Sequence, residues 1–188
     1  MRIIAGTARN LELAAPPGFG VRPTLARSRK ALFDSLGPFA GRRVLDLFAG
    51  SGALGLEAAS RGAEQVVLVE RDPVHFRVLE DNVARIRKTG VESRIMTFNA
   101  DALDPCRYAS AGSADLIFAD PPYAGSTEAF RMLLCNAKFR SAFAGALLVW
   151  EVPDTPGAAG TLLETAASTE WNIRKFGSVI FLLGRISA

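Results

Sequence analysis

Beyond Arg42, short apolar segments alternate with segments of helical periodicity, and this alternation limits the folds open to the chain. The apolar segments have the length of buried strands, and the segments between them are long enough to be crossover helices. Such alternation predicts an α/β fold, a parallel sheet with helices on both faces. We expect strands at residues 44–47, 65–69, 94–98, 115–119 and 146–152, helices at 53–61, 72–88 and 127–137, a loop at 153–160, and a closing hairpin at 171–175 and 178–183 around Gly177.

Length and composition exclude several classes of protein. The 188 residues suit one domain, and 49% hydrophobic with 22% charged residues is typical of a globular protein. No apolar run reaches the roughly 18–20 residues of a membrane helix, and none near the N-terminus suits a secretory signal. Two cysteines and one histidine leave little material for a disulfide scaffold, a zinc site or a catalytic triad. We expect a monomer of the reducing cytoplasm, with no metal and no membrane partner.

Positive charge is concentrated near the N-terminus. Residues 1–43 hold eight basic and two acidic residues, whereas residues 44–188 hold 14 basic and 17 acidic residues. The first 20 residues have the pattern of a small hairpin or extended arm, and a helix is expected to begin at Pro23 and to end at Gly37. We therefore expect a basic extension at residues 1–40 that binds a polyanion, and a second domain at residues 41–188. A solvated helix face is the alternative explanation of the charge.

A glycine-rich turn follows the first expected strand, in Asp46-Leu47-Phe48-Ala49-Gly50-Ser51-Gly52-Ala53-Leu54-Gly55. Glycine lets the backbone approach a ligand closely, and the N-terminus of a helix offers unpaired N–H groups. The glycine spacing leaves open both a dinucleotide and another nucleoside cofactor. Asp46 suits a cationic ligand group better than a pyrophosphate, and the absence of a following Gly-Lys-Ser or Gly-Lys-Thr excludes a Walker phosphate loop.

Acidic residues also follow the next two expected strands. Glu70 comes 20 residues after Gly50, where a carboxylate can accept hydrogen bonds from both hydroxyls of a ribose. Asp101 can accept from the exocyclic amine of adenine, and the N–H of Ala102 can donate to a ring nitrogen. A helix cap at Asp101 is an alternative role, and both roles can hold at once.

The fourth expected strand ends in Asp120-Pro121-Pro122-Tyr123, the most specific motif in the chain. Proline has a fixed φ and no N–H, which leaves the Pro121 carbonyl and the Asp120 carboxylate as two rigid acceptors. Two such acceptors suit an exocyclic NH₂ group and turn its lone pair toward an electrophile. Tyr123 offers a flat face on which a base taken out of its helix can stack. A proline-stiffened turn with a capping Asp is the structural alternative.

At these residues the chain resembles the S-adenosylmethionine-dependent methyltransferases of Rossmann-like fold that methylate exocyclic amines of bases. It is most similar to the bacterial 16S rRNA guanine-N2 methyltransferase family of RsmD type. The resemblance rests on Met1-Arg2-Ile3-Ile4-Ala5-Gly6, Arg22-Pro23-Thr24, Arg27-Ser28-Arg29, Ala31-Leu32-Phe33, residues 45–58, Ser60-Arg61-Gly62-Ala63 and Asp120-Pro121-Pro122-Tyr123. The chain departs from the family pattern at Leu25, Ala26 and Lys30, which leave more positive charge, and at Phe176, where a Tyr is frequent.

The resemblance implies a seven-stranded sheet with an antiparallel last strand and transfer of methyl from S-adenosyl-L-methionine to N2 of a guanine in 16S rRNA or the assembling small subunit. It implies catalytic roles for Asp120, Pro121, Pro122 and Tyr123, and cofactor binding by Asp46, Phe48, Ala49, Gly50, Ser51, Gly52, Glu70, Arg71, Asp101, Ala102 and Asp120. Arg22, Thr24, Arg27, Arg29 and Lys30 are the expected RNA-binding residues.

Three other functions are compatible with parts of the sequence. An amino-methyltransferase acting on another RNA, or on adenine N6 or cytosine N4 of DNA, uses the same acceptor geometry, although the chain leaves no room for a large DNA-recognition domain. A nicotinamide oxidoreductase uses the glycine turn and Glu70 but gives no role to the segment 120–123. A non-catalytic RNA-binding module needs the basic extension alone. A cofactor-binding titration distinguishes the last two from a methyltransferase.

Overall fold

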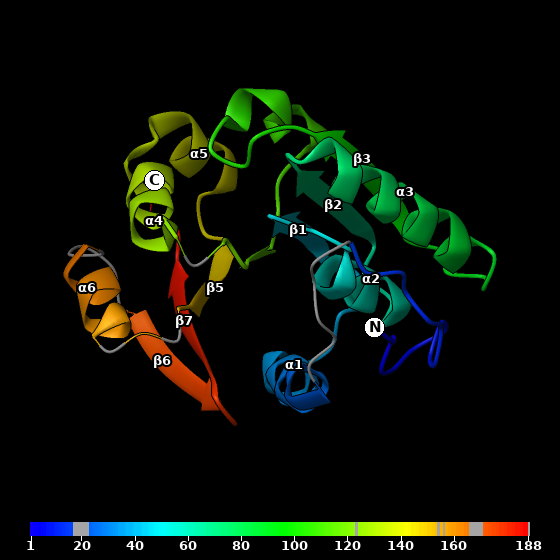
Figure 1. Cartoon of the computed structure of the whole chain (residues 1–188). Helices are drawn as coiled ribbons and strands as arrows, with labels where there is room; N and C mark the ends of the chain where they lie inside the picture. Colours follow the sequence, from blue (N-terminus) through cyan, green and yellow to red (C-terminus); the bar gives the residue numbers. More distant parts are fainter. Residues whose placement is uncertain (17–22, 123, 154, 156, 166–170, 188) are drawn as a thin grey trace.

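The computed structural model describes residues 1–16, 23–122, 124–153, 155, 157–165 and 171–187. Within these ranges it contains one mixed sheet in the order β3-β2-β1-β4-β5-β7-β6 (Figure 1). Strands β1 to β5 are parallel, and β7 runs antiparallel to both β5 and β6. The strands are β1 (Arg43–Leu47), β2 (Gln65–Glu70), β3 (Arg94–Asn99), β4 (Leu116–Ala119), β5 (Leu147–Val152), β6 (Trp171–Phe176) and β7 (Val179–Arg185).

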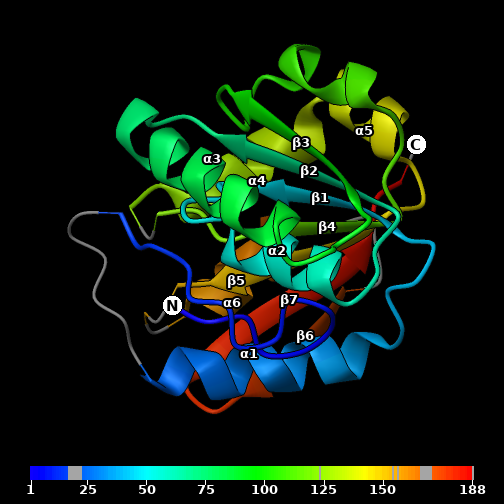
Figure 2. The ribbon, with the colours of Figure 1, turned by 90° about the vertical axis from the view of Figure 1, so that its right-hand side faces the viewer.

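The described helices cover both faces of this sheet. Helices α1 (Pro23–Leu36), α2 (Ala53–Ser60) and α3 (Pro73–Arg87) pack against one face, and α4 (Ser126–Cys135), α5 (Ala137–Phe143) and α6 (Ala158–Thr165) against the other. Figure 2 shows α1 lying beneath the β6–β7 end of the sheet. The α/β architecture and the seven-stranded sheet with its antiparallel last strand are confirmed.

The sequence prediction was wrong in the region after β4. The helix expected at 127–137 ends at Cys135, and a second helix begins at Ala137, because the Asn136 side chain accepts a hydrogen bond from the Phe139 N–H, 3.0 Å, and caps it. The loop expected at 153–160 becomes helical from Ala158, where α6 buries Leu162 against the sheet. The dense Pro and Gly of this segment had favoured a loop, but burial of Leu162 decides the helix.

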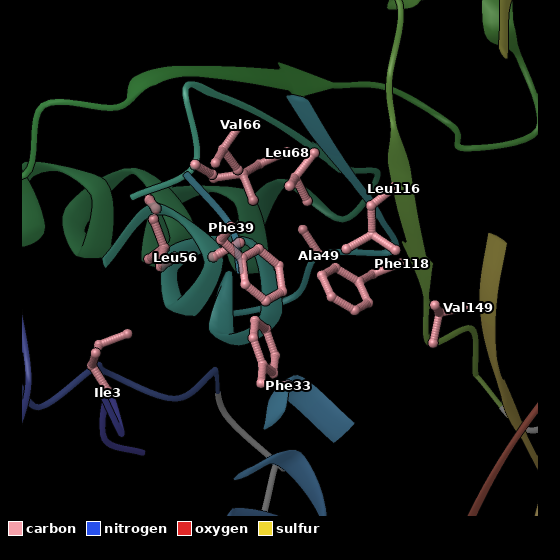
Figure 3. Close-up of a cluster of buried hydrophobic side chains, with 14 of the residues drawn as sticks. Ile3, Phe33, Phe39, Ala49, Leu56, Val66, Leu68, Leu116, Phe118 and Val149 are labelled. Atoms are coloured by element: carbon pink, nitrogen blue, oxygen red, sulfur yellow. The ribbon is translucent and has the colours of Figure 1, made fainter. Parts of the chain in front are cut away.

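Apolar side chains fill the space between the sheet and each helical layer. On the α1–α3 face, Phe33 stacks on Phe39 with ring centroids 5.0 Å apart and contacts Phe118 of β4, and all three rings are buried (Figure 3). On the opposite face, Trp150 lies between Phe48 and Phe130 and is fully buried. Two filled interfaces hold the sheet rigid, so the loops at its carboxyl edge project from a fixed frame.

The N-terminal arm packs onto α2 through buried polar contacts. The Glu57 carboxylate accepts hydrogen bonds from the N–H groups of Ile4 and Ala5, 2.7 and 3.1 Å, and from Arg61 Nε, 2.8 Å. The Ser60 hydroxyl accepts from the Ala8 N–H and donates to the Ala5 carbonyl. Of the two expected forms, a small hairpin or an extended arm, the structure has the hairpin, with one isolated antiparallel bridge between Arg2 and Glu12.

Candidate active site

The carboxyl ends of the parallel strands bring the predicted residues into one row. Because Leu47 lies opposite both Val69 and Ala119, the residues that follow each of them, Phe48, Glu70 and Asp120, lie at the same level. Asn99 extends this row on the β3 side, directly opposite Glu70. Ligands of open α/β sheets bind outside this edge. The topology therefore places the glycine turn directly between the Glu70 and Asp120 strands.

The glycine turn is held by the carboxylate that follows the second strand. Glu70 is 8% exposed, and its two oxygens accept hydrogen bonds from the N–H groups of Gly50, 2.8 Å, and Asp72, 2.7 Å. Phe48 and Gly50 have φ of 59° and 55°, a region that costs a non-glycine residue free energy. A Cβ at Gly50 would meet nothing within 4 Å, so the outer side of the turn is open to a ligand.

Asp46 lies under the turn and is 1% exposed. One of its carboxylate oxygens accepts a hydrogen bond from the Gly55 N–H, 2.8 Å, in the first turn of α2. Burial raises its pKa to about 8, opposed by that hydrogen bond, and the charges of Asp120 and Glu70 raise it further. A cation bound above the turn would offset this cost and favour the ionised carboxylate.

The raised pKa of Asp46 predicts how stability changes with pH in the ligand-free protein. A carboxyl that holds its proton more tightly when folded stabilises the fold below its ordinary pKa of 3.8, and this contribution disappears as the pH rises through about 8. We expect Asp46→Asn to gain stability relative to wild type over this window, by about 1.4 kcal/mol per pH unit. Urea unfolding at a series of pH values measures the difference, and a constant difference would contradict it.

The residues that follow β3, which include Asp101, lie beside Glu70, as expected from the sequence. The Asp101 carboxylate accepts from the Leu103 N–H, 2.9 Å, and pairs with exposed Arg71, 3.2 Å. The Asn99 side chain donates to the carbonyls of Glu70 and Arg71, which ties the ends of β2 and β3 together. Asp101 therefore has the capping role that was its structural alternative. A ligand amine would have to share the Asp101 carboxylate with Arg71.

The segment after β4 combines a buried and an exposed acceptor. Pro121 is buried, whereas Asp120 and Pro122 are exposed to solvent. The crowded protein surroundings of Asp120 raise its pKa to about 6, although its side chain still reaches water. Tyr123 lies outside the described residues. The structure thus brings the Asp120 segment beside the glycine turn, while stacking on Tyr123 stays a prediction.

Sequence reasoning missed two polar residues that border this site. Glu151 lies at the same level as Asp120, because Ala119 is opposite Trp150. The sequence feature that could have identified Glu151 is an acidic residue near the end of an apolar strand. Asn82 is fully buried in α3 and bonds to Ala14 of the arm and to the carbonyl of Ser51 in the glycine turn. Nothing in the local sequence marks Asn82, because its partners are far away in the chain.

The structure separates the basic residues of the N-terminal segment. Arg27 and Lys30 are exposed on α1, and Lys30 pairs with Asp34, 2.5 Å. Arg29 is 7% exposed and donates to the carbonyl of Arg2, so it holds the arm against α1. The prediction that Arg29 contacts RNA does not fit this position and is corrected to a structural role. Arg22 and the side chain of Thr24 lie outside the described part of the chain.

The residues of the site fit a nucleoside cofactor that carries a positive charge. Helix α2 begins after Gly52 with no side-chain cap, and the buried carboxyl of Asp46 lies beneath its first turn. Glu70 retains acceptor capacity beside the open side of Gly50.

In the described residues no group of three or more His, Cys, Asp or Glu could hold a metal ion. No described helix is long and apolar enough to cross a membrane.

Comparisons with known proteins agree with this geometry. The model of the family described as "Conserved hypothetical protein 95" matches residues 1–180. The ribosomal RNA small subunit methyltransferase D of Escherichia coli (strain K12) is 39% identical over 127 residues, and that of Haemophilus influenzae (strain Rd) is 34% identical over 125 residues. Each alignment covers 65% of this chain but only 60% and 64% of these relatives.

Solved structures match the whole chain. The Escherichia coli protein yhhF, described as a methyltransferase, superposes with a TM-score of 0.71 at 31% identity, covering 100% of this chain and 98% of that one. A hypothetical protein of Thermus thermophilus gives a TM-score of 0.69 at 34% identity, with 100% and 99% covered. The Rossmann-like sheet and the match over residues 1–180 together show that the chain belongs to the Conserved hypothetical protein 95 family, the methyltransferases of RsmD type.

Proposed function

We propose that this protein transfers a methyl group from S-adenosyl-L-methionine to the exocyclic N2 amine of a guanine in 16S rRNA. The observation that carries the proposal is the position of Asp120 and Pro121 beside the glycine turn, at the ends of the paired strands β4 and β1. An amine held there lies next to the reactive end of a cofactor bound on the turn. The choice of small-subunit rRNA as the substrate comes from the names of the relatives. Because the alignments cover only part of those proteins, this substrate is proposed for the present chain.

Cofactor binding is assigned to the residues around the turn. Glu70 accepts from the ribose hydroxyls, Asp101 and Ala102 border the adenine with Arg71 nearby, and Asp46 lies beneath the methionine portion. The turn itself contributes Phe48, Ala49, Gly50, Ser51 and Gly52. When bound, the cofactor supplies a methyl group activated by a positively charged sulfur. Positioning then supplies most of the rate enhancement, since the methyl group is already reactive.

In the proposed mechanism the protein orients the amine. The Asp120 carboxylate and the Pro121 carbonyl accept its two hydrogens, which turns the nitrogen lone pair toward the methyl group for in-line attack. Transfer of the methyl group to this nitrogen would break its bond to the cofactor's sulfur. The extra proton on nitrogen is acidic after transfer and leaves to water or to Asp120. Pro122 stiffens the segment, and Tyr123 stacks on the flipped base.

The partner and the organisation of the chain follow as proposals. Residues 1–40 serve as the RNA-gripping extension of the methyltransferase domain at 41–188, with Arg27 and Lys30 as its exposed cations. The protein acts as a cytoplasmic monomer on rRNA or on the assembling small subunit.

Variants of Arg27 and Arg29, both on α1, distinguish a role in RNA binding from a role in folding. We expect Arg27→Ala to weaken rRNA binding several-fold and to lower the slope of log K against log salt by about 0.7–0.9, the loss of one phosphate contact. Arg29→Ala is expected to lower stability instead, because its buried guanidinium holds the arm. RNA titrations at several salt concentrations, beside urea unfolding, measure both. Wild-type affinity and slope in the Arg27 variant would make α1 an ordinary solvated face.

Methyl transfer to defined substrates tests the proposed function directly. Labelled S-adenosyl-L-methionine is incubated with the protein and with small-subunit particles, free rRNA or matched DNA from a strain lacking the enzyme, followed by nucleoside analysis. Label in N2-methylguanine of the small-subunit RNA supports the proposal. Label in N6-methyladenine, N4-methylcytosine or DNA would replace it with another amino-methyltransferase activity.

A further inference from the structure

Four carboxyl side chains gather at the carboxyl edge of the sheet, and the protein itself uses two of them. Asp46 accepts from the Gly55 N–H, and Glu70 accepts from the N–H groups of Gly50 and Asp72. Asp120 and Glu151 differ, because neither carboxyl accepts a hydrogen bond or forms an ion pair with any described residue. Asp120 is exposed and Glu151 is partly exposed, so a ligand that brings N–H donors can reach both carboxyls.

The carboxyls of Asp120 and Glu151 lie side by side on the same face of the sheet. Ala119 of β4 is opposite Trp150 of β5, and both point into the core on the α4–α6 side. Because side chains alternate along a strand, the next residues, Asp120 and Glu151, point to the other face. Neighbouring strands are about 4.8 Å apart, close enough for one planar ligand to contact both carboxyls.

On the side away from Asp120, toward β7, the neighbour of Glu151 is apolar. It is only partly exposed, and its partner across β7 is buried Phe181. Burial raises the pKa of Glu151 to about 8, and the neighbouring charge of Asp120 contributes to the rise. N–H donors that bind between the two carboxyls favour their ionised forms, in which each carboxylate only accepts hydrogen bonds.

We propose that Glu151 determines base specificity by accepting the N1–H of guanine while Asp120 and the Pro121 carbonyl hold the adjacent N2 amine. Guanine presents three N–H hydrogens along this edge, which match three acceptors. Adenine and cytosine also have an exocyclic amine, but the neighbouring ring nitrogen is an acceptor and would face the carboxylate. A site built to accept a hydrogen bond rejects a ligand that cannot donate one. This inference rests on the proposed function and deepens it.

A base analogue that keeps the 2-amine but lacks the N1–H, together with the 6-oxo group, tests this role. We use an rRNA fragment with guanine or 2-aminopurine at the methylated position, because 2-aminopurine keeps the 2-amine but has a lone pair at N1. The wild-type protein is expected to prefer guanine by about 100-fold or more in kcat/KM. Glu151→Gln, whose amide can donate to N1, is expected to reduce this preference at least tenfold and to lower kcat/KM for guanine. Glu92→Gln, an exposed residue before β3, is the matched control.

The outcomes separate this inference from the proposed function. Cofactor affinity and the unfolding midpoint of Glu151→Gln are measured in parallel, since a merely structural role would lower these without changing the preference between bases. An unchanged preference, or a loss confined to cofactor affinity, would overturn the role of Glu151 while N2-methylguanine formation by the wild type still stands. Methylation of another base by the wild type would overturn the proposed function and this inference with it.

Discussion

Asp120→Ala is expected to lower kcat by about 100-fold or more while cofactor affinity changes less than about threefold. Loss of a preorganised polar contact that acts in the transition state has this magnitude. Asp120 is exposed at the edge of the site, and no described residue donates a hydrogen bond to its carboxyl, so its removal leaves the packing intact. Single-turnover methyl transfer and calorimetric titration of the cofactor measure the two quantities.

Two further variants make this prediction specific. Asp120→Asn keeps an oxygen acceptor without the charge and is expected to fall between wild type and the alanine variant. Asp81→Ala removes an exposed carboxylate on α3, away from the row of strand ends, and should behave as wild type. Equal losses of turnover and of cofactor affinity in Asp120→Ala would refute an amine-orienting role and move Asp120 to the cofactor.

The second large effect concerns the fold. We expect Glu57→Ala to lower the free energy of unfolding by about 3–5 kcal/mol, the cost of removing one partner from a buried charged pair. The Glu57 side chain is fully buried and binds Arg61 Nε together with two N–H groups of the arm. The variant leaves these donors without an acceptor. Urea unfolding gives the change, and hydrogen exchange at Ile4 and Ala5 reports whether the arm is released.

The control for this experiment is Glu64→Ala, an exposed residue between α2 and β2, which should stay within about 0.5 kcal/mol of wild type. If Glu57→Ala lowers stability but Ile4 and Ala5 remain protected, the contacts made by Ser60 hold the arm and Glu57 stabilises α2 alone.

Local sequence features were sufficient for most elements of the fold. The strands from β1 to β5 were predicted to within a few residues at each end because apolar runs and the turns around them are properties of neighbouring residues. The helix expected at 72–88 is also found, as α3, and the Asp72 side chain caps it by accepting from the N–H groups of Val74 and His75. Helices α5 and α6 were missed as separate elements because packing against the sheet, not local pattern, decides them.

The sequence by itself determined that chemistry-bearing residues follow four strands, since each lies directly after an apolar run. Only the tertiary structure decided which of them act together. The sheet order places β4 between β1 and β5, so Asp120 meets both the glycine turn and Glu151, which is 31 residues further along the chain. The same holds for Arg29, whose charge indicates a surface residue but whose side chain is buried against the arm. Side-chain orientation and strand adjacency depend on contacts between distant segments, and no local pattern encodes them.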